Sequence, residues 1–373
     1  MSRPRNHVLN DAERTDEPAR CSLKGRGAPV SPNPRFLKER RESFDDGWED
    51  GDEELVRPAT TVTAESPRTI ISRNTSPDIP FNQSINPYKG CEHGCVYCYA
   101  RPTHAYLDLS PGLDFETRIF SKPNAAKLLR KELTDKSYRC DPIVLGANTD
   151  PYQPVERRNQ ITRAIIEVLV EHRHPVRIIT KSALVERDID LLNPMAKEGL
   201  VEVIVSVTSL DRTLTRRLEP RAAAPQRRLV TIERLCSARI PCGTLFAPII
   251  PNLNDIELET VLEAVAQAGA SRAGFVLLRL PLEIKEIFVQ WLAEHYPLKA
   301  KHVMALLREM RGGEDYDSQF GKRMRGTGVY AKLLEQRFAA ACKRLGLKRG
   351  GAILDTTRFC VPDPAGQLTL LHS

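Results

Sequence analysis

The sequence predicts an α/β protein whose core is an incomplete parallel barrel of six βα units. Between residues 85 and 295, short apolar runs alternate six times with longer amphipathic segments, which is the pattern of a βα repeat. Most of these runs are continuously apolar, as expected of parallel strands covered on both faces. Six successive units favour a barrel related to the (β/α)₈ fold, and a doubly wound open sheet is the competing arrangement.

The six expected strands are apolar runs that turn polar at their C-terminal ends. They cover residues 85–91, 143–149, 176–182, 201–209, 243–250 and 273–280. The helices expected between and after them cover residues 122–133, 161–172, 187–197, 225–238, 255–268 and 283–295. Pro123 lies at a favoured first-turn position of the first helix, and Asn159 is placed to cap the second.

The chain divides into three predicted parts. Residues 1–65 mix dense opposite charges with Pro and Gly and lack a helical or strand period, so we expect a disordered charged extension. Trp48 in its acidic run could bind a partner, and a solvated acidic linker is the alternative. Residues 66–295 hold the barrel. Residues 296–373 are expected to form a mainly helical basic extension, with helices near 301–311 and 329–345.

The formal net charge of +7 is concentrated near the C-terminus, where residues 301–350 hold twelve Lys and Arg against five Asp and Glu. Nucleic acid would meet this segment, and a solvated basic helix face is the alternative. No apolar run approaches the roughly 20 residues that span a bilayer, and the first thirty residues are not signal-like. We therefore expect a cytoplasmic protein without a membrane segment, in which nine cysteines serve metal binding, catalysis or burial rather than disulfides.

The sharpest functional signal is a loop with CxxxCxxC spacing, in which Cys91, Cys95 and Cys98 directly follow the first expected strand. Three thiolates on one tight loop can bind three irons of a [4Fe–4S] cluster and leave the fourth iron open. One alternative is a zinc site with His93 as fourth ligand, although zinc sites usually pair two short ligand motifs and a second is missing. A cluster used only for electron transfer is another alternative.

This loop resembles the signature of the radical S-adenosylmethionine (SAM) superfamily. The resemblance implies a [4Fe–4S] cluster whose open iron is chelated by SAM, with a flavodoxin or ferredoxin-type protein as reductant. It further implies reductive cleavage of SAM to a 5′-deoxyadenosyl radical that abstracts hydrogen from a substrate. Within the superfamily, patches between residues 86 and 255 resemble the branch of spore photoproduct lyase, which is described as DNA repair photolyase-like. These patches are residues 95–99, 147–150, 206–209, 218–220 and 247–249.

The same resemblance implies SAM contacts. Thr149, Lys181 and Ser209 match positions that contact SAM in the lyases, where hydroxyl groups satisfy the ribose and a lysine pairs with the carboxylate. The alternatives are a surface lysine at a helix start for Lys181 and a helix N-cap for Ser209. Asp150 and Ser206 also lie at strand ends. Asp150 would face SAM or substrate, or cap the loop that follows the second expected strand, which we call the second loop.

Tyr97 and Tyr99 are predicted catalytic residues on this resemblance. They match tyrosines proposed to relay hydrogen atoms in the lyases, and Tyr97 would also shelter the cluster and the adenine side of SAM; packing beside the cluster is the alternative. The lyases carry a hydrogen-donor cysteine where this chain has Ala147, so the lyase reaction is not implied. Glu219 and Arg221 are expected to form an ion pair that shapes the loop after the fourth strand. The alternative function is a non-catalytic, metal-stabilised nucleic-acid-binding protein.

Overall fold

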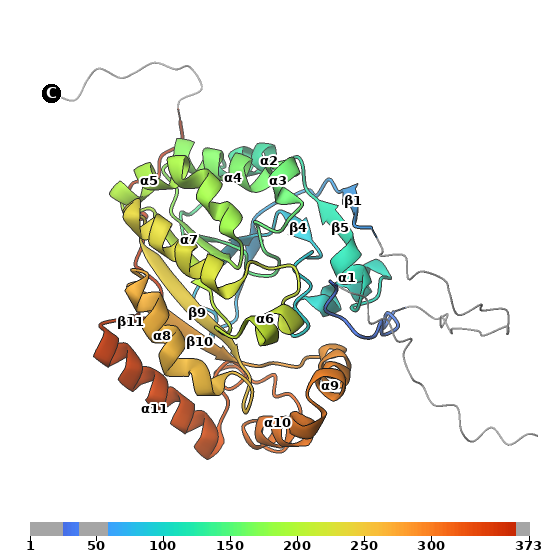
Figure 1. The fold of residues 1–373 in the computed structure, drawn as a ribbon. Coiled ribbons are helices and arrows are strands. Elements are labelled where there is room, and N and C mark those ends of the chain that lie inside the picture. The colour runs from blue at the N-terminus through green and yellow to red at the C-terminus, as the bar shows by residue number, and fades with distance from the viewer. Residues whose placement is uncertain (1–24, 37–58, 363–373) are drawn as a thin grey trace, which may run out of the picture.

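The computed structural model describes residues 25–36 and 59–362, and an eight-stranded sheet forms the core of the described chain (Figure 1). A doubly wound sheet reverses its strand order in the middle, whereas a barrel keeps the order of the chain. Six parallel strands keep that order here, and the predicted incomplete six-unit parallel barrel is confirmed. They are β3 (Gln83–Ile85), β6 (Ile143–Leu145), β7 (Val176–Thr180), β8 (Val201–Ser206), β9 (Cys242–Ile249) and β10 (Arg272–Leu277).

Helices follow the strands as predicted, with differences at their ends. They are α2 (Ala125–Leu133), α4 (Ile161–Glu171), α5 (Ile189–Lys197), α7 (Pro225–Ser237), α8 (Leu258–Gln267) and α9 (Ile284–His295). Asn159 does not cap α4; it ends the short helix α3 (Glu156–Asn159), and the chain passes through a left-handed Gln160 before α4 begins. A further helix, α6 (Arg212–Leu218), follows β8 and was not predicted.

The first two strands are shorter than expected. They end at Ile85 and Leu145, whereas the sequence predicts that they continue to residues 91 and 149. The chain leaves the sheet at these points because the following residues, Asn86 and Gly146 among them, line the cavity at the end of the barrel. Gly146 has a φ of +90°, which an L side chain rarely adopts, so the turn after β6 depends on glycine.

The chain after residue 295 both adds helices and extends the sheet. Helix α11 (Gly328–Leu345) packs against α8, and α10 (Pro297–Glu309) precedes it (Figure 1). Beyond α11, β11 (Lys348–Arg349) pairs in parallel with β10, while β2 (Ser72–Arg73) forms the opposite edge of the sheet. The backbone N–H of Ala352 then donates to the buried Glu202 carboxylate (2.9 Å), which ties this segment to the N-terminal ends of the strands.

The structure describes two stretches of the segment predicted to be disordered, residues 25–36 and 59–65. A second, three-stranded sheet consists of β1 (Thr61–Ala64), β5 (Arg118–Ser121) and β4 (Tyr88–Lys89). Residues 25–36 also pack against the barrel and bury Ala28 and Val30. A segment of this kind needs no hydrophobic period of its own, because the surface on which it packs supplies its contacts. The rest of residues 1–65, Trp48 included, lies outside the described residues.

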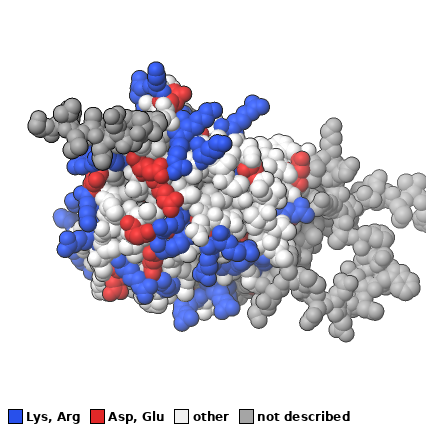
Figure 2. All heavy atoms as spheres, turned by 90° about the horizontal axis from the view of Figure 1, so that it is seen from above, with Lys and Arg blue, Asp and Glu red and all other residues white. Residues whose placement is uncertain are grey.

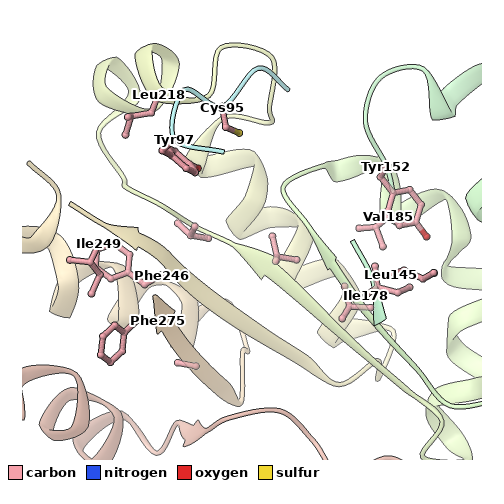
Figure 3. Close-up of a cluster of buried hydrophobic side chains, with 14 of the residues drawn as sticks. Cys95, Tyr97, Leu145, Tyr152, Ile178, Val185, Leu218, Phe246, Ile249 and Phe275 are labelled. Atoms are coloured by element: carbon pink, nitrogen blue, oxygen red, sulfur yellow. The ribbon is translucent and has the colours of Figure 1, made fainter. Parts of the chain in front are cut away.

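Apolar side chains of the strands pack into one buried cluster inside the barrel (Figure 3). Ile178, Phe246 and Phe275 contribute to it from three different strands, and Cys95 and Tyr97 belong to the same cluster. The cysteine loop is therefore packed on the barrel core. Among the residues that the structure describes, no helix combines the length and the apolar character needed to cross a membrane.

Candidate functional site

A cavity of about 820 Å³ runs through the barrel interior, and the cysteine loop forms part of its wall at the C-terminal ends of the strands. Cys91, Cys95 and Cys98 all line this cavity, together with Tyr97 and Tyr99 of the same loop. Cys91 and Cys95 are buried, and Cys98 is partly exposed. The structure thus brings the three predicted cluster ligands to one space.

The buried guanidinium of Arg101 holds the backbone of the cysteine loop. Its Nε donates to the Cys95 carbonyl (2.8 Å), its Nη2 donates to the Gly94 carbonyl (3.0 Å), and it forms an ion pair of 2.6 Å with Glu116. The Glu116 carboxylate also accepts hydrogen bonds from two backbone N–H groups of the segment 25–36. Sequence reasoning missed both charged residues, because nothing in their spacing separates them from surface arginines and glutamates.

The segment 25–36 and the cysteine loop meet closely enough to require glycine. A Cβ atom at Gly27 would lie 1.7 Å from the Gly94 carbonyl oxygen, and Gly94 itself has a φ of +66°. Elsewhere along the loop, Gln153 donates from Nε2 to the Gly90 carbonyl (3.1 Å). Protein contacts therefore determine the path of the loop.

The donors in this loop fit a [4Fe–4S] cluster. Each cysteine of such a cluster binds a different iron, so the thiols need not converge on one ion; in the described part of the chain, no group of three His, Cys, Asp or Glu side chains could hold a single metal ion. Burial raises the pKa of Cys91 well above its ordinary value and that of Cys95 to about 12, the latter against the opposing charge of Lys181. Iron binding would therefore release protons from these thiols.

Lys181 lines the cavity within a cluster of buried charged groups. Its Nζ lies 5.8 Å from the centre of the Tyr97 ring. Glu219 accepts a hydrogen bond from the Tyr97 hydroxyl and pairs with Arg228. Burial alone would lower the pKa of Lys181, but the facing Cys95 and Glu219 groups outweigh burial and raise it. Lys181 is therefore a cation held beside the cysteine loop, which corrects the alternative of a surface lysine at a helix start.

The prediction of an ion pair between Glu219 and Arg221 is wrong. Glu219 is buried and points to Arg228 of α7, whereas the partly exposed Arg221 pairs with Glu92 at 3.1 Å. The two side chains therefore have different partners, and nearness in sequence did not identify them. Arg228 is thus, like Arg101, a buried arginine near the cysteine loop, to which it is linked through Glu219 and Tyr97.

Asp150 caps the second loop and also lines the cavity. Its Oδ1 accepts hydrogen bonds from Thr180 Oγ1 (2.7 Å) and the Tyr152 backbone N–H (2.9 Å), and its Oδ2 accepts one from the Lys181 backbone N–H (2.7 Å). His93 Nδ1 lies 3.4 Å from Oδ2. Burial alone would raise the pKa of Asp150, but His93 and these hydrogen bonds lower it to about 2. The carboxylate is thus ionised and saturated with protein donors.

Two of the predicted SAM contacts lie outside the lining of the cavity. Thr149 Oγ1 donates to the Tyr88 carbonyl (2.9 Å), and Ser209 Oγ donates to the Glu257 carboxylate (2.8 Å). Both hydroxyl groups are buried in contacts within the protein. The N-cap of α6 is Asp211, so Ser209 does not fill the alternative role either. Ser206, by contrast, lines the cavity as predicted for a strand-end residue.

The two predicted catalytic tyrosines differ in exposure. Tyr97 is 8% exposed and its hydroxyl is occupied by Glu219, whereas Tyr99 is 44% exposed. The Tyr99 hydroxyl donates to the Ala147 carbonyl, and the Arg279 guanidinium lies over its ring, 4.4 Å from the centre. Of the two rings, Tyr99 is therefore the one that extends into the open part of the cavity.

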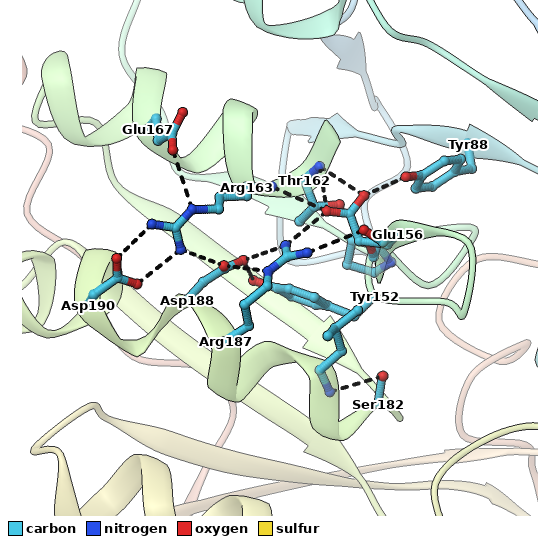
Figure 4. A network of polar contacts seen from close by, with 12 residues as sticks. Tyr88, Tyr152, Glu156, Thr162, Arg163, Glu167, Ser182, Arg187, Asp188 and Asp190 are labelled. Carbon is cyan, nitrogen blue, oxygen red and sulfur yellow. Dashed lines mark hydrogen bonds and ion pairs between the residues drawn. The ribbon is translucent and has the colours of Figure 1, made fainter. Parts of the chain in front are cut away.

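A network of ion pairs outside the cavity stabilises the second loop (Figure 4). Arg187 binds the buried carboxylates of Glu156 (2.9 Å) and Asp188 (2.8 Å), and Arg163 pairs with Asp188 at 2.9 Å. Tyr88, which precedes the cysteines, donates to Glu156. None of these side chains lines the cavity, so the network positions the loops without entering the site.

Comparison with known proteins agrees with this geometry. Residues 85–265 match the family model described as "Radical SAM superfamily". The matched segment therefore belongs to the radical SAM superfamily, and the barrel that contains it has an α/β fold with a mostly parallel sheet.

The relatives include proteins without an assigned function. An uncharacterized protein of Mycobacterium tuberculosis is 39% identical over 221 residues, which cover 59% of this chain and 65% of the relative. An uncharacterized protein of Methanocaldococcus jannaschii is 29% identical over 174 residues, or 46% of this chain and 62% of the relative. The chain thus spans slightly less than two thirds of the length of either relative.

Among solved structures, spore photoproduct lyase complexed with a dinucleoside spore photoproduct is similar in fold. Its TM-score is 0.54 at 18% sequence identity, and the match covers 77% of this chain and 81% of the lyase. A mutant of the same lyase, solved with bound AdoMet and the dinucleoside spore photoproduct, has a TM-score of 0.50 at 18% identity. At this identity the likeness shows the fold alone.

Proposed function

We propose that this chain is a radical SAM enzyme in which Cys91, Cys95 and Cys98 hold a [4Fe–4S] cluster and the adjoining cavity binds SAM and a substrate. The observation that carries the proposal is that the three thiols of the superfamily loop border the same cavity as Lys181. Cys91, Cys95 and Cys98 would hold the cluster, and the chemistry that the cluster and SAM would supply there is one-electron cleavage of SAM to methionine and a 5′-deoxyadenosyl radical able to abstract hydrogen from a substrate.

The residues of this chain would bind, orient and shield that reaction. Lys181 offers a cation to the SAM carboxylate, and Ser206 offers a hydroxyl group from the end of β8. Asp150 orients the second loop through its hydrogen bonds and presents its face to the cavity. Tyr97 closes the site beside the cysteines, and Tyr99 is the better placed of the two tyrosines for a hydrogen-atom relay because it reaches the open part of the cavity.

A flavodoxin or ferredoxin-type protein is the proposed electron donor, because the cluster needs one electron at low potential for each cleavage. The lyase-type reaction is not part of the proposal, since Ala147 offers only a methyl group and a carbonyl at the position of the lyase cysteine. The proposal covers the abstraction of hydrogen from the substrate, and the fate of the substrate radical depends on the substrate.

Nucleic acid as a substrate or partner receives little support from the basic C-terminal segment. Most of its arginines form ion pairs with carboxylates: Arg323 with Asp78, Arg325 and Arg349 with the single carboxylate of Glu335, Arg337 with Glu259, and Arg344 with Glu263. On another face, the one at the top of Figure 1, basic side chains also lie in separate groups with acidic side chains among them (Figure 2). Sequence-independent binding to phosphates depends on free cations, so the enzyme is favoured over a nucleic-acid-binding protein.

SAM cleavage tests the proposal. The full chain would be reconstituted anaerobically with iron and sulfide, reduced with dithionite and supplied with SAM. The expected products are 5′-deoxyadenosine and methionine in equal amounts. Protein with a full complement of iron that leaves SAM intact under these conditions would contradict the proposed activity.

A further inference from the structure

Five of the seven arginines that line the cavity pair with a carboxylate. The carboxylates are Glu202, Asp78 and Glu335. The two others are Arg73, which is exposed on the edge strand, and Arg279, which is half-buried at the end of β10. Within residues 25–36 and 59–362, Arg279 has no ion pair with a carboxylate.

A second guanidinium strengthens the positive field around Arg279. Arg311 is 3% exposed and donates to the carbonyl groups of Leu278 (2.9 Å), Lys322 (2.9 Å) and Arg323 (2.9 Å). These acceptors are neutral, and none of them forms an ion pair with Arg311. Burial lowers the pKa of Arg311 most, Tyr316 and Asp317 raise it, and the nearby charge of Arg279 lowers it. Two guanidinium groups thus share one region of low dielectric, which favours an anion beside them.

We infer that Arg279, seated on the Tyr99 ring, binds an anionic group of the substrate, either a phosphate or a carboxylate. This inference rests on the proposed function. A guanidinium presents two parallel N–H groups that match either anion, and the aromatic face below it fixes its direction. The paired arginines of the cavity are engaged by their carboxylates, so Arg279 is the half-buried arginine of the described lining that remains for a ligand.

The position of Arg279 connects this anion site to the cysteine loop. Tyr99 directly follows Cys98, and its hydroxyl is fixed to the Ala147 carbonyl at the second loop. A substrate whose anionic group lies on Arg279 therefore extends along the Tyr99 ring toward the part of the cavity that the thiols line. The neutral remainder of the substrate, where hydrogen would be abstracted, lies on the cluster side.

Anion binding by the reconstituted full chain in the presence of SAM tests this inference. Inorganic phosphate and acetate would be titrated by calorimetry at constant ionic strength into the parent, Arg279→Gln and Arg325→Gln. Arg325→Gln is the matched control, because Arg325 lines the same cavity but pairs with Glu335 at 2.9 Å. We expect saturable binding of one anion by the parent, at least tenfold weaker binding by Arg279→Gln, and less than a twofold change in the control.

The outcomes distinguish a phosphate from a carboxylate, and a failure of the anion site from a failure of the proposed function. Tighter binding of phosphate identifies a phosphate-bearing substrate, and tighter binding of acetate identifies a carboxylate. Absence of saturable binding by an iron-replete parent, or an equal loss in both variants, overturns the anion site alone. A higher SAM requirement in Arg279→Gln also overturns it, because the guanidinium would then serve the SAM carboxylate. A parent that takes up no iron contradicts the proposed function instead.

Discussion

Replacing Arg101 with methionine should both destabilise the chain and impair cluster assembly. The guanidinium and its partner Glu116 are fully buried, and their ion pair measures 2.6 Å. The same guanidinium satisfies the carbonyl groups of Cys95, Gly94, Pro111 and Gly112. Removing one partner of a buried pair costs roughly 3–5 kcal/mol, because the remaining charge is left without compensation. We expect a loss of that size in the free energy of unfolding of the metal-free chain.

Urea denaturation followed by circular dichroism would measure this loss, and iron analysis after anaerobic reconstitution would measure cluster assembly. Arg118→Met is the control: Arg118 pairs with Asp114 at 3.4 Å, but its side chain is half exposed, so a change of about 0–1 kcal/mol is expected. An unfolding free energy of Arg101→Met within about 1 kcal/mol of the parent, with unchanged iron, would refute the role that we assign to the buried pair.

Three further predictions concern the surroundings of the site. Gly27→Ala should speed hydrogen exchange in residues 25–36, because the added methyl group would lie 1.7 Å from the Gly94 carbonyl oxygen; unchanged exchange in this segment would argue against the close contact. Lys181→Met should raise the SAM concentration for half-maximal cleavage about tenfold or more through loss of a charge-assisted hydrogen bond worth roughly 1.5–3 kcal/mol, and an unchanged requirement would remove Lys181 from the SAM site. Burial lowers the pKa of His174 to about 4, below the value of about 6.5 in the unfolded chain. The neutral imidazole therefore contributes about 3 kcal/mol to the free energy of unfolding above pH 6.5, and this contribution is lost as the pH falls toward 4. Urea midpoints should therefore fall more steeply over this pH range in the parent than in His174→Gln, and parallel curves would contradict the assignment.

The sequence predicted the barrel because its signal is local. Strands covered on both faces read as continuous apolar runs, and β7, β8, β9 and β10 lie within one or two residues of the expected starts. The cysteine spacing is local as well, and the structure brings those three thiols to one cavity. Hydrogen-bond partners are a different case. Thr149 and Ser209 lie in the loops after β6 and β8 rather than on the strands, and each hydroxyl group donates to a protein acceptor that only the folded chain supplies.

Long-range partners could not be predicted from this one sequence. Arg101 contacts Glu116 and the cysteine loop, and the segment 25–36 reaches the same loop from a part of the chain that reads as disordered. Likewise, Glu219 could pair with any of several arginines, and its buried partner Arg228 was selected by the packing of α7 rather than by distance along the chain. Charge composition alone does not distinguish a buried arginine from a solvated one.

Iron and sulfide content per chain tests the central claim most directly. The full chain and the triple variant Cys91→Ala, Cys95→Ala, Cys98→Ala would be reconstituted anaerobically side by side, with Cys140→Ala, Cys342→Ala, Cys360→Ala as the matched control. These three control cysteines lie outside the cavity lining. We predict about four irons per chain in the parent and the control and almost none in the loop variant. Equal iron and sulfide in all three proteins would contradict the assignment of the loop as the cluster site.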